Sequence, residues 1–261
     1  ASMAVSRGRG HAATRMPPER VLVSGDSTWE VYRPIDDDWL GPFDLTHTRL
    51  GHATLSLTDI FDNAGDFFID PVHRALLIGG EGSGPNTLET LQVDTEESIM
   101  LSSVLPFNLR DMAAANVVIE ENLVLIVGGV DLDTGNSIPN AWLLKIPEDT
   151  LREVDPLPNR SGGIANHQVI ALDDRYAVVV GGEQVSGETR TPLDYYAVFD
   201  VETESWIESG LTLFPRANAA ATALDDRSIL VVGGGASGDP PTQLRRDGEV
   251  LTLEIDPNGA P

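Results

Sequence analysis

One apolar segment returns at regular intervals along the chain. Val21–Gly25 is the first copy, and four more apolar runs end in two glycines, at Ala75–Gly80, Leu123–Gly129, Tyr176–Gly182 and Ser228–Gly234. The second glycine position falls at residues 25, 80, 129, 182 and 234, so the steps are 55, 49, 53 and 52 residues. A period of this size, holding short β-rich segments, indicates a repeat fold built from one supersecondary unit.

The fourth repeat, which opens at Arg160, shows the unit most clearly. The sequence predicts a half-buried strand over 166–172, a polar tight turn, and a buried strand over 176–180 that ends in two glycines. A polar loop over 183–192 follows, and then come a third strand over 195–200 and a fourth strand marked by Trp206. Four short antiparallel strands per unit, repeated around an axis, predict a β-propeller.

The other repeats keep this order with local changes. The third and fifth repeats have the arginine, the inner strand, an acidic turn and the apolar run ending in Gly-Gly. In the first repeat Trp39 corresponds to Trp206, but Ser24 replaces the first glycine. The second repeat carries extra residues, roughly Asp59 to Asp70, between its first two strands. Asp59, Asp62, Asn63 and Asp66 in this insertion are a weak match to the oxygen ligands of a calcium loop.

This succession of residues resembles the kelch repeat over nearly the whole chain. The resemblance implies an all-β, kelch-type β-propeller, for which we expect five four-stranded blades in one domain, 1–261. The expected repeats span about 7–48, 49–109, 110–159, 160–215, and 216–261 together with 1–6.

The two termini suggest how such a ring would close. Ala1–Ser6 precedes Arg7 just as Leu211–Pro215 precedes Arg216. We therefore expect Met3–Ser6 to be the outer strand of the last blade, which would cover an otherwise open sheet edge. The alternative is a piece of a larger propeller, because kelch propellers more often have six or seven blades.

The amino-acid composition limits the classes of partner that the protein is expected to bind. The formal charge is -24, with 41 acidic residues, so nucleic acid and anionic membrane surfaces are disfavoured. No apolar run approaches the roughly 20 residues that span a bilayer, which predicts no membrane insertion. The chain has no cysteine, which leaves the redox compartment open. We expect a monomer, and a secreted or periplasmic location is favoured over a cytoplasmic one.

An arginine opens every repeat, and these arginines are the first candidates for ligand binding. They are Arg7 or Arg9, Arg49, Arg110, Arg160 and Arg216. The resemblance implies that they share one face with the loops after Gly-Gly, namely Glu81–Asn86, Asp131–Asn140, Glu183–Pro192 and Ala236–Gln243. An arginine ring could bind an anionic ligand or an acidic peptide bidentately. The alternative is that each arginine pairs with a carboxylate or a carbonyl of the protein.

Two further sets of residues could carry a site. His11 and His52 match in Gly-His-Ala, and hydrogen-bonded structural roles are favoured for them over metal binding. Asp131 and Asp133 begin a loop with the alternating oxygen ligands of a calcium site, although no downstream Glu completes that pattern. Apart from this possible calcium, the sequence predicts no cofactor.

The sequence lacks the motifs of several known kinds of catalytic and phosphate-binding site. There is no Gly-x-Ser-x-Gly elbow, and the glycines at 79–84 open no predicted helix that would bind phosphate. Galactose oxidase is a kelch enzyme whose copper site uses a Tyr–Cys cross-link, and that cofactor cannot form in a chain without cysteine.

The sequence therefore predicts first a non-enzymatic binding module that presents a loop-rich face to a protein or a small anionic ligand. A carbohydrate-active or other channel-site enzyme using Asp, Glu or His is the alternative, and a calcium-dependent surface protein is a third.

Overall fold

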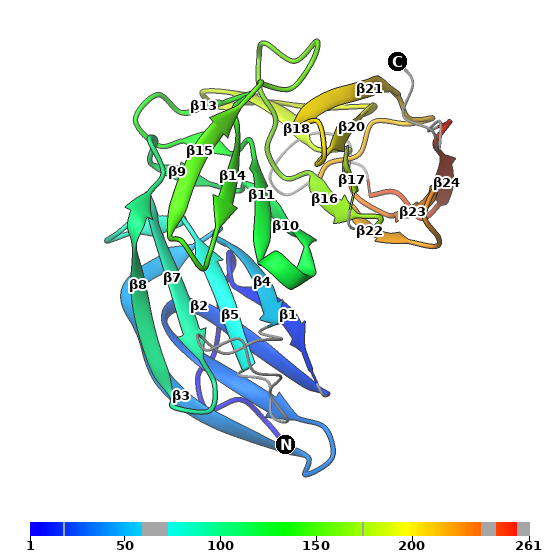
Figure 1. Ribbon diagram of the computed structural model, residues 1–261. Coiled ribbons are helices and arrows are strands. Elements are labelled where there is room, and N and C mark those ends of the chain that lie inside the picture. Colours follow the sequence, from blue (N-terminus) through cyan, green and yellow to red (C-terminus); the bar gives the residue numbers. More distant parts are fainter. Residues whose placement is uncertain (18, 59–72, 174, 236–243, 255–261) are drawn as a thin grey trace. The chain divides into compact units, whose positions relative to one another are not determined.

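The structure is a computed structural model, and it describes residues 1–17, 19–58, 73–173, 175–235 and 244–254. These residues form an all-β fold with one short 3-10 helix, η1 (Ile119–Glu121), so the predicted fold class is confirmed at this level (Figure 1). No helix in these ranges is long and apolar enough to cross a membrane. The expected loop residues Asp59–Asp70 and Ala236–Gln243 lie outside the described residues.

The chain divides into two compact units. Unit 1 comprises Ala1–Asp111, Ile119–Leu123 and Leu144–Leu151. Unit 2 comprises Met112–Val118, Val124–Leu143 and Arg152–Pro261. The division passes through the sheet of the third repeat, and the expectation of one domain remains a prediction.

The first sheet lies in unit 1 and has the order β1-β2-β3-β6. Its strands are β1 (Ala12–Met16), β2 (Arg20–Arg33), β3 (Asp38–Leu50) and β6 (Glu81–Gly82). Residues 20–24 of β2 pair with β1, and residues 26–33 pair with β3. The first repeat therefore does not form four strands of its own, because only two residues separate Gly25 from Thr28 and the chain continues as one long strand.

The next three repeats each form the predicted four-stranded antiparallel sheet. The second repeat contributes β4 (Ala53–Thr58), β5 (His73–Ile78), β7 (Thr87–Gln92) and β8 (Glu97–Val104). The third contributes β10 (Ala113–Val118), β11 (Leu123–Val127), β14 (Ala141–Lys145) and β15 (Thr150–Val154). The fourth contributes β16 (Gln168–Ala171), β17 (Tyr176–Val180), β20 (Tyr195–Asp200) and β21 (Ser205–Leu211).

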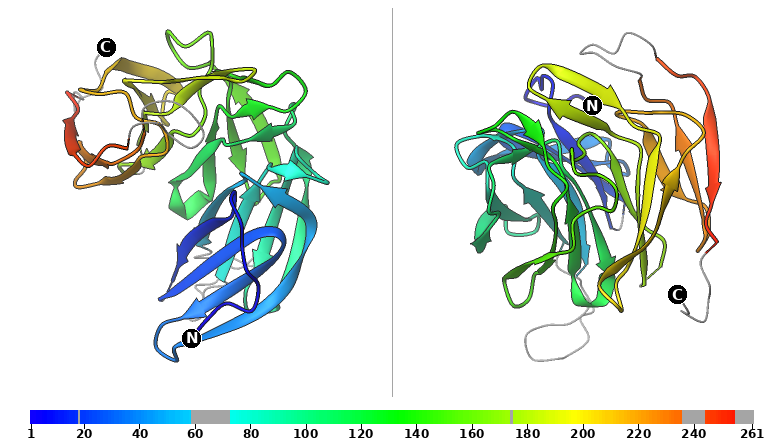
Figure 2. Two further views of the ribbon diagram at one scale, coloured as in Figure 1. Left: turned by 180° about the vertical axis from the view of Figure 1, so that it is seen from behind. Right: turned by 90° about the horizontal axis from the view of Figure 1, so that it is seen from above.

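The last sheet has three strands among the described residues. They are β22 (Ala220–Ala223), β23 (Ser228–Val232) and β24 (Gly248–Thr252), drawn in orange to red in Figure 2. Residues Met3–Ser6 form no strand, so the prediction of an N-terminal strand there is wrong. The N-terminal segment is held by the first sheet instead, since the backbone N–H of Ala4 donates to Glu30 at 2.7 Å.

Short strands also form where the sequence predicted only polar loops. Within unit 2, β12 (Val130–Asp131), β13 (Asn136–Ser137), β18 (Glu183–Ser186) and β19 (Thr189–Pro192) have the order β19-β18-β13-β12. Unit 1 contains β9 (Leu109–Arg110). The turn of the β18–β19 hairpin contains Gly187, whose φ of +59° suits glycine.

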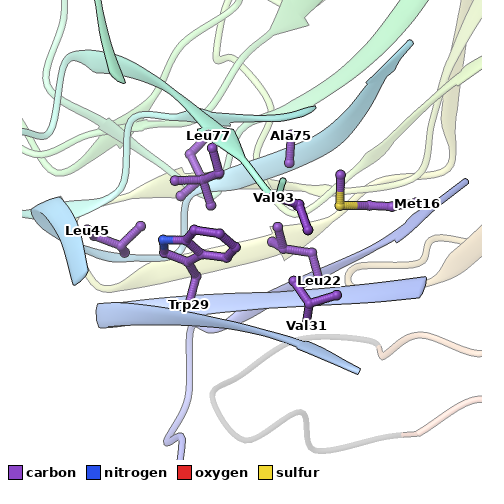
Figure 3. Packing of buried hydrophobic residues seen from close by; sticks show 9 residues of the cluster. Met16, Leu22, Trp29, Val31, Leu45, Ala75, Leu77 and Val93 are labelled. Carbon is purple, nitrogen blue, oxygen red and sulfur yellow. The ribbon is translucent and has the colours of Figure 1, made fainter. Parts of the chain in front are cut away.

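Apolar side chains from neighbouring sheets build the cores. In unit 1 the buried Trp29 indole lies among Leu22, Leu45 and Leu77 (Figure 3). In unit 2 Val178, Val198 and Ile229 belong to a similar cluster. The second strand of the fourth repeat, β17, is buried throughout, which explains why its sequence is continuously apolar.

Trp29→Ala tests this packing. Removing a fully buried indole should lower the free energy of unfolding by about 3–5 kcal/mol. Ile35→Ala is the control, because Ile35 is 83% exposed and its truncation should change stability by less than about 0.5 kcal/mol. Urea unfolding of the two variants measures both values, and equal losses would contradict the described core.

Candidate active site

Three of the repeat arginines are buried in the same arrangement, which we call the Arg–Glu clamp. Each clamp consists of an arginine, a glutamate from a strand of the same repeat, and the backbone N–H three residues before the arginine. The members are Arg7, Glu30 and Ala4; Arg49, Glu89 and Thr46; and Arg216, Glu249 and Leu213. Each glutamate thus accepts from a guanidinium and from a backbone N–H.

The guanidinium groups of the clamps also bind the backbone of their own repeat. Arg49 Nη1 donates to the carbonyls of Gly79 at 2.6 Å and Thr87 at 3.2 Å. Arg216 Nη1 donates in the same way to Gly233 at 2.8 Å and Asp247 at 3.1 Å. The side chains of Arg49 and Arg216 are 0% and 1% exposed, so their hydrogen bonds lie inside the protein, although Arg216 Nη2 is buried without a hydrogen-bond partner. This geometry favours the alternative of internal pairing for both.

Arg110 and Arg160 do not occupy the clamp position. The second glycine of each Gly-Gly donates its N–H to a backbone carbonyl at the start of the next repeat. The acceptor is Leu109 for the second repeat, Ile164 for the third and Arg216 for the fourth. Leu109 and Ile164 therefore stand where Arg216 stands, and the prediction of equivalent arginines in every repeat is wrong. The residue at the glutamate position differs as well. In the second and fifth repeats the glutamate comes two residues after the residue whose carbonyl accepts from the N–H of the first glycine of Gly-Gly. By the same rule this position holds Trp142 in the third repeat and Ala197 in the fourth.

The two displaced arginines have different surroundings. Arg110 Nη1 lies 3.7 Å from carboxylate oxygens of both Glu81 and Asp111. Arg160 Nη2 donates to the neutral Gln184 side chain at 3.1 Å, and its guanidinium lies 5.5 Å from the centre of the Tyr195 ring. Ligand binding by Arg49, Arg110, Arg160 and Arg216 stays a prediction, and the structure leaves Arg160 the least committed to other groups.

A histidine occupies the start of the inner strand in three repeats, not two. His11, His52 and His167 each follow a residue with a left-handed backbone, Gly10, Gly51 and Asn166. His167 was not recognised as a match from the sequence, because extra residues between Arg160 and Ile164 increase its distance from the arginine that marks the repeat. A Cβ on Gly80 or Gly182 would lie 2.8 or 2.7 Å from the Cβ of His52 or His167, so the second glycine leaves room for the histidine.

The first-repeat serine has a partner among these histidines. Ser24 Oγ lies 2.8 Å from His52 Nε2, and both side chains are buried. Burial, assisted by the positive charge of Arg49, lowers the pKa of His52 to about 3. Burial likewise lowers the pKa of His167 to about 3. Both imidazoles are therefore neutral at ordinary pH, in structural surroundings.

The candidate calcium loop is closed by its own hydrogen bonds. Asp131 Oδ1 accepts from the N–H of Asp133 at 3.1 Å, and Asp131 Oδ2 accepts from the Thr134 hydroxyl at 2.8 Å. Within the described ranges, no group of three or more His, Asp or Glu side chains could hold a metal ion.

One buried carboxylate outside the clamps has an arrangement suited to chemistry. Glu183, the first residue of β18, is 3% exposed, and its Oε1 accepts from Asn166 Nδ2 at 2.8 Å and from Arg190 Nη1 at 2.5 Å. Its Oε2 accepts no hydrogen bond from the described residues, and this oxygen is not completely buried. One oxygen is thus fixed by two donors, while the other forms no hydrogen bond within the described residues.

Pairing within the hairpin positions this group. Arg190 in β19 faces Val185 in β18, so Arg190 and Glu183 lie on the same face of the hairpin. Asn166, with φ of +53°, presents its amide from the start of the inner strand of the same repeat. Glu183 lies in one of the loops predicted to carry a site, but no local pattern in the sequence distinguishes it from the other acidic residues.

Comparison with known proteins gives structural neighbours only. The sequence matches no family model and no curated protein. The solved structure titled "Structure of YjhT" has a TM-score of 0.71 at 13% identity, over 94% of this chain and 81% of that one. A fungal alcohol oxidase of the AA5 family, in complex with copper, has a TM-score of 0.58 at 15% identity, over 96% of this chain and 64% of that one. These likenesses establish a shared all-β fold.

The comparisons also correct the first functional prediction. A neighbour along nearly the whole chain is an alcohol oxidase, so the expectation of a non-enzymatic binding module is wrong, and the enzyme alternative fits better. The copper of that neighbour does not fit the residues present here. The chain has no cysteine, and the described residues contain no cluster of metal-binding side chains.

The clamp makes a prediction about stability. Arg49→Ala leaves Glu89 buried without its cation and should lower the free energy of unfolding by about 3–5 kcal/mol. Arg152→Ala removes an exposed pair with Glu204 and should cost less than about 1 kcal/mol. Chemical denaturation distinguishes the two, and a loss at Arg49 no larger than that at Arg152 would mean that the clamp is not a stabilising element.

The neutral histidines predict how stability depends on pH. The unfolded chain takes up a proton on each histidine near pH 6.5, whereas folded His52 and His167 do so only near pH 3. The unfolded state therefore binds more protons in between, and stability falls as the pH is lowered from about 6.5 toward 3, by about 1.4 kcal/mol per pH unit for each histidine.

Urea unfolding at several pH values in this window measures the slope. His52→Gln should reduce it by the share of one histidine. Ser24→Ala, which keeps the imidazole but removes its partner, should retain the slope. An unchanged slope in His52→Gln would contradict the buried, neutral state of His52.

Proposed function

We propose that this protein is an enzyme that acts by acid–base catalysis on a carbohydrate or a related small hydroxyl-bearing molecule, with Glu183 as the proton-transferring group. The observation that carries the proposal is the half-occupied carboxylate of Glu183. Oε1 is anchored by Asn166 and Arg190, and Oε2 is free to exchange a proton with a substrate hydroxyl.

The contrast with the clamp glutamates supports this assignment. Both oxygens of Glu89 and Glu249 are used by the fold, through a guanidinium and a backbone N–H in each case. Glu183 has the same degree of burial but keeps one oxygen unoccupied. A carboxylate held rigidly on one side is preorganised for proton transfer on the other.

The substrate class rests on two arguments. The alcohol oxidase that shares the fold acts on an alcohol, and carbohydrates and polyols present the same hydroxyl groups. A single active carboxylate favours proton transfer, as in isomerisation or elimination, over glycoside hydrolysis, which uses two facing carboxylates. In this proposal Arg190 positions Glu183 and balances its charge, and Asn166 fixes the carboxylate plane.

We propose further that the repeats are the blades of a five-bladed, kelch-type propeller. Support comes from a backbone link that recurs before the inner strands. Gly51 donates its N–H to Gly10 and Asp111 donates to Gly51 in unit 1, and Asn218 donates to Asn166 in unit 2. Such links between equivalent residues of successive repeats are the contacts that radial repetition produces.

Glu183→Gln tests the proposed function. A panel of neutral and acidic mono- and disaccharides and polyols is incubated with the protein in D2O, and one-dimensional NMR follows new signals and signals lost to exchange. The wild-type protein should transform at least one compound, and Glu183→Gln should slow that reaction by about 10²–10⁴-fold because the proton-transferring group is gone.

Glu188→Gln is the matched control, since Glu188 is an exposed carboxylate in the turn of the same hairpin. This variant should react at the wild-type rate, and thermal melting should confirm that both variants are folded. A Glu183→Gln rate equal to that of Glu188→Gln would refute the assignment of Glu183.

A further inference from the structure

Arg160 is a partly buried cation without an acidic partner. Arg49, Arg110, Arg190 and Arg216 each have a carboxylate oxygen within 4.0 Å. No acidic group of the described residues forms an ion pair with Arg160, although the chain has 41 acidic residues and a net charge of -24. Arg15, Arg227 and Arg246 form no ion pair with the described residues either, but they are exposed, whereas Arg160 is partly buried with its charge unpaired.

The backbone around Arg160 is held in one conformation. Gly163 donates its N–H to the Arg160 carbonyl at 2.8 Å, which closes a tight turn. Ser137 Oγ donates to the Gly162 carbonyl at 2.8 Å, and the Tyr195 hydroxyl donates to the Pro158 carbonyl at 2.8 Å. The segment that carries Arg160 is therefore tied to β13 on one side and to β20 on the other.

The side chain is also partly positioned. The Tyr195 ring lies beneath the guanidinium, and the Gln184 carbonyl oxygen accepts from Nη2. A Cβ on Gly162 would lie 2.4 Å from Gln184 Nε2, so a larger residue there would displace the amide from its present position. Arg160 Nε is buried with no hydrogen-bond partner, as are Arg7 Nε and Arg216 Nη2, but in Arg160 Nη1 also forms no hydrogen bond within the described residues.

These features match the requirements of an oxyanion site. A guanidinium presents its donors as a planar fork that binds two oxygens of one carboxylate, sulfate or phosphate group. Stacking on an aromatic ring and a bond to a neutral amide fix the fork without neutralising it. Leaving donors unpaired costs free energy in the empty protein, and a bound oxyanion would recover that cost.

We propose that Arg160, with Gln184 and Tyr195, binds the oxyanion group of a small molecule. Gln184 and Glu183 are consecutive in β18, so their side chains point to opposite faces of the strand. The oxyanion site is thus distinct from the proton-transferring group, and its existence does not depend on the proposed catalysis.

Calorimetric titration with D-glucuronate, D-glucose 6-sulfate, D-glucose 6-phosphate and D-glucose tests the proposal. The measurement uses Glu183→Gln protein, so that no turnover interferes and failure of the proposed catalysis leaves the result readable. At least one anionic sugar should bind about tenfold or more tightly than glucose, the preference that one charged hydrogen-bonded pair supplies. Comparison of the three anions identifies the preferred group.

Arg160→Gln, made in the same background, should reduce that preference to less than about twofold. Arg152→Gln, which removes an exposed arginine paired with Glu204, should keep it. Equal binding of glucose and all three anions, or a preference that survives Arg160→Gln, would overturn the proposal. If Arg160→Gln does not fold, the ¹⁵Nε–¹Hε signal of Arg160 decides: it should shift during titration with the anion, and a signal that stays in place refutes the site.

Discussion

A buried arginine that binds one glutamate and two backbone carbonyls is the interaction on which the first, second and fifth repeats depend. In these repeats it joins the segment entering the repeat to the glycine turn and to the strand that carries the glutamate. A charge so deeply buried is tolerated only when its partners are complete. The clamp therefore fixes the position of the incoming segment, and it engages Arg49 and Arg216 in hydrogen bonds within the protein.

The third and fourth repeats lack the clamp, and the residues suited to function lie there. Leu109 and Ile164 replace the arginine, and Trp142 and Ala197 replace the glutamate, so apolar side chains take over positions that are polar elsewhere. Arg160 is released from the structural role, and the hairpin β18–β19 carries Glu183 and Arg190. Departure from the repeat pattern, more than the pattern itself, marks the candidate site.

Much of the fold could be predicted from the sequence because strand burial leaves a direct trace in residue type. The apolar runs at β5, β11 and β17 form largely buried strands, as expected, whereas β23 is only partly buried. The glycines that follow all four have left-handed backbones. The hairpin at β18–β19 was missed because alternating polar residues of this length resemble a loop. The expected strand at Met3–Ser6 was wrong because the Glu30 carboxylate binds the backbone of Ala4 in place of a strand partner.

The candidate site was only partly predictable. The arginines were found by their type and spacing, but their register depends on hydrogen bonds of the glycine turns that no spacing reveals. His167 was missed because extra residues precede it, and Glu183 was indistinguishable among many carboxylates. What separates Glu183 from them is a geometric fact, namely that both of its donors bind the same oxygen.

The central claim is that ligand contact belongs to the fourth repeat and not to the clamped arginines. Chemical-shift mapping of isotopically labelled protein with a sugar that it transforms or binds tests this claim most directly. The account predicts that the largest shifts fall on Asn166 and on residues 183–192, while the guanidinium signals of Arg49 and Arg216 stay unchanged. Large shifts at those two guanidinium groups, with none in the β18–β19 hairpin, would contradict it.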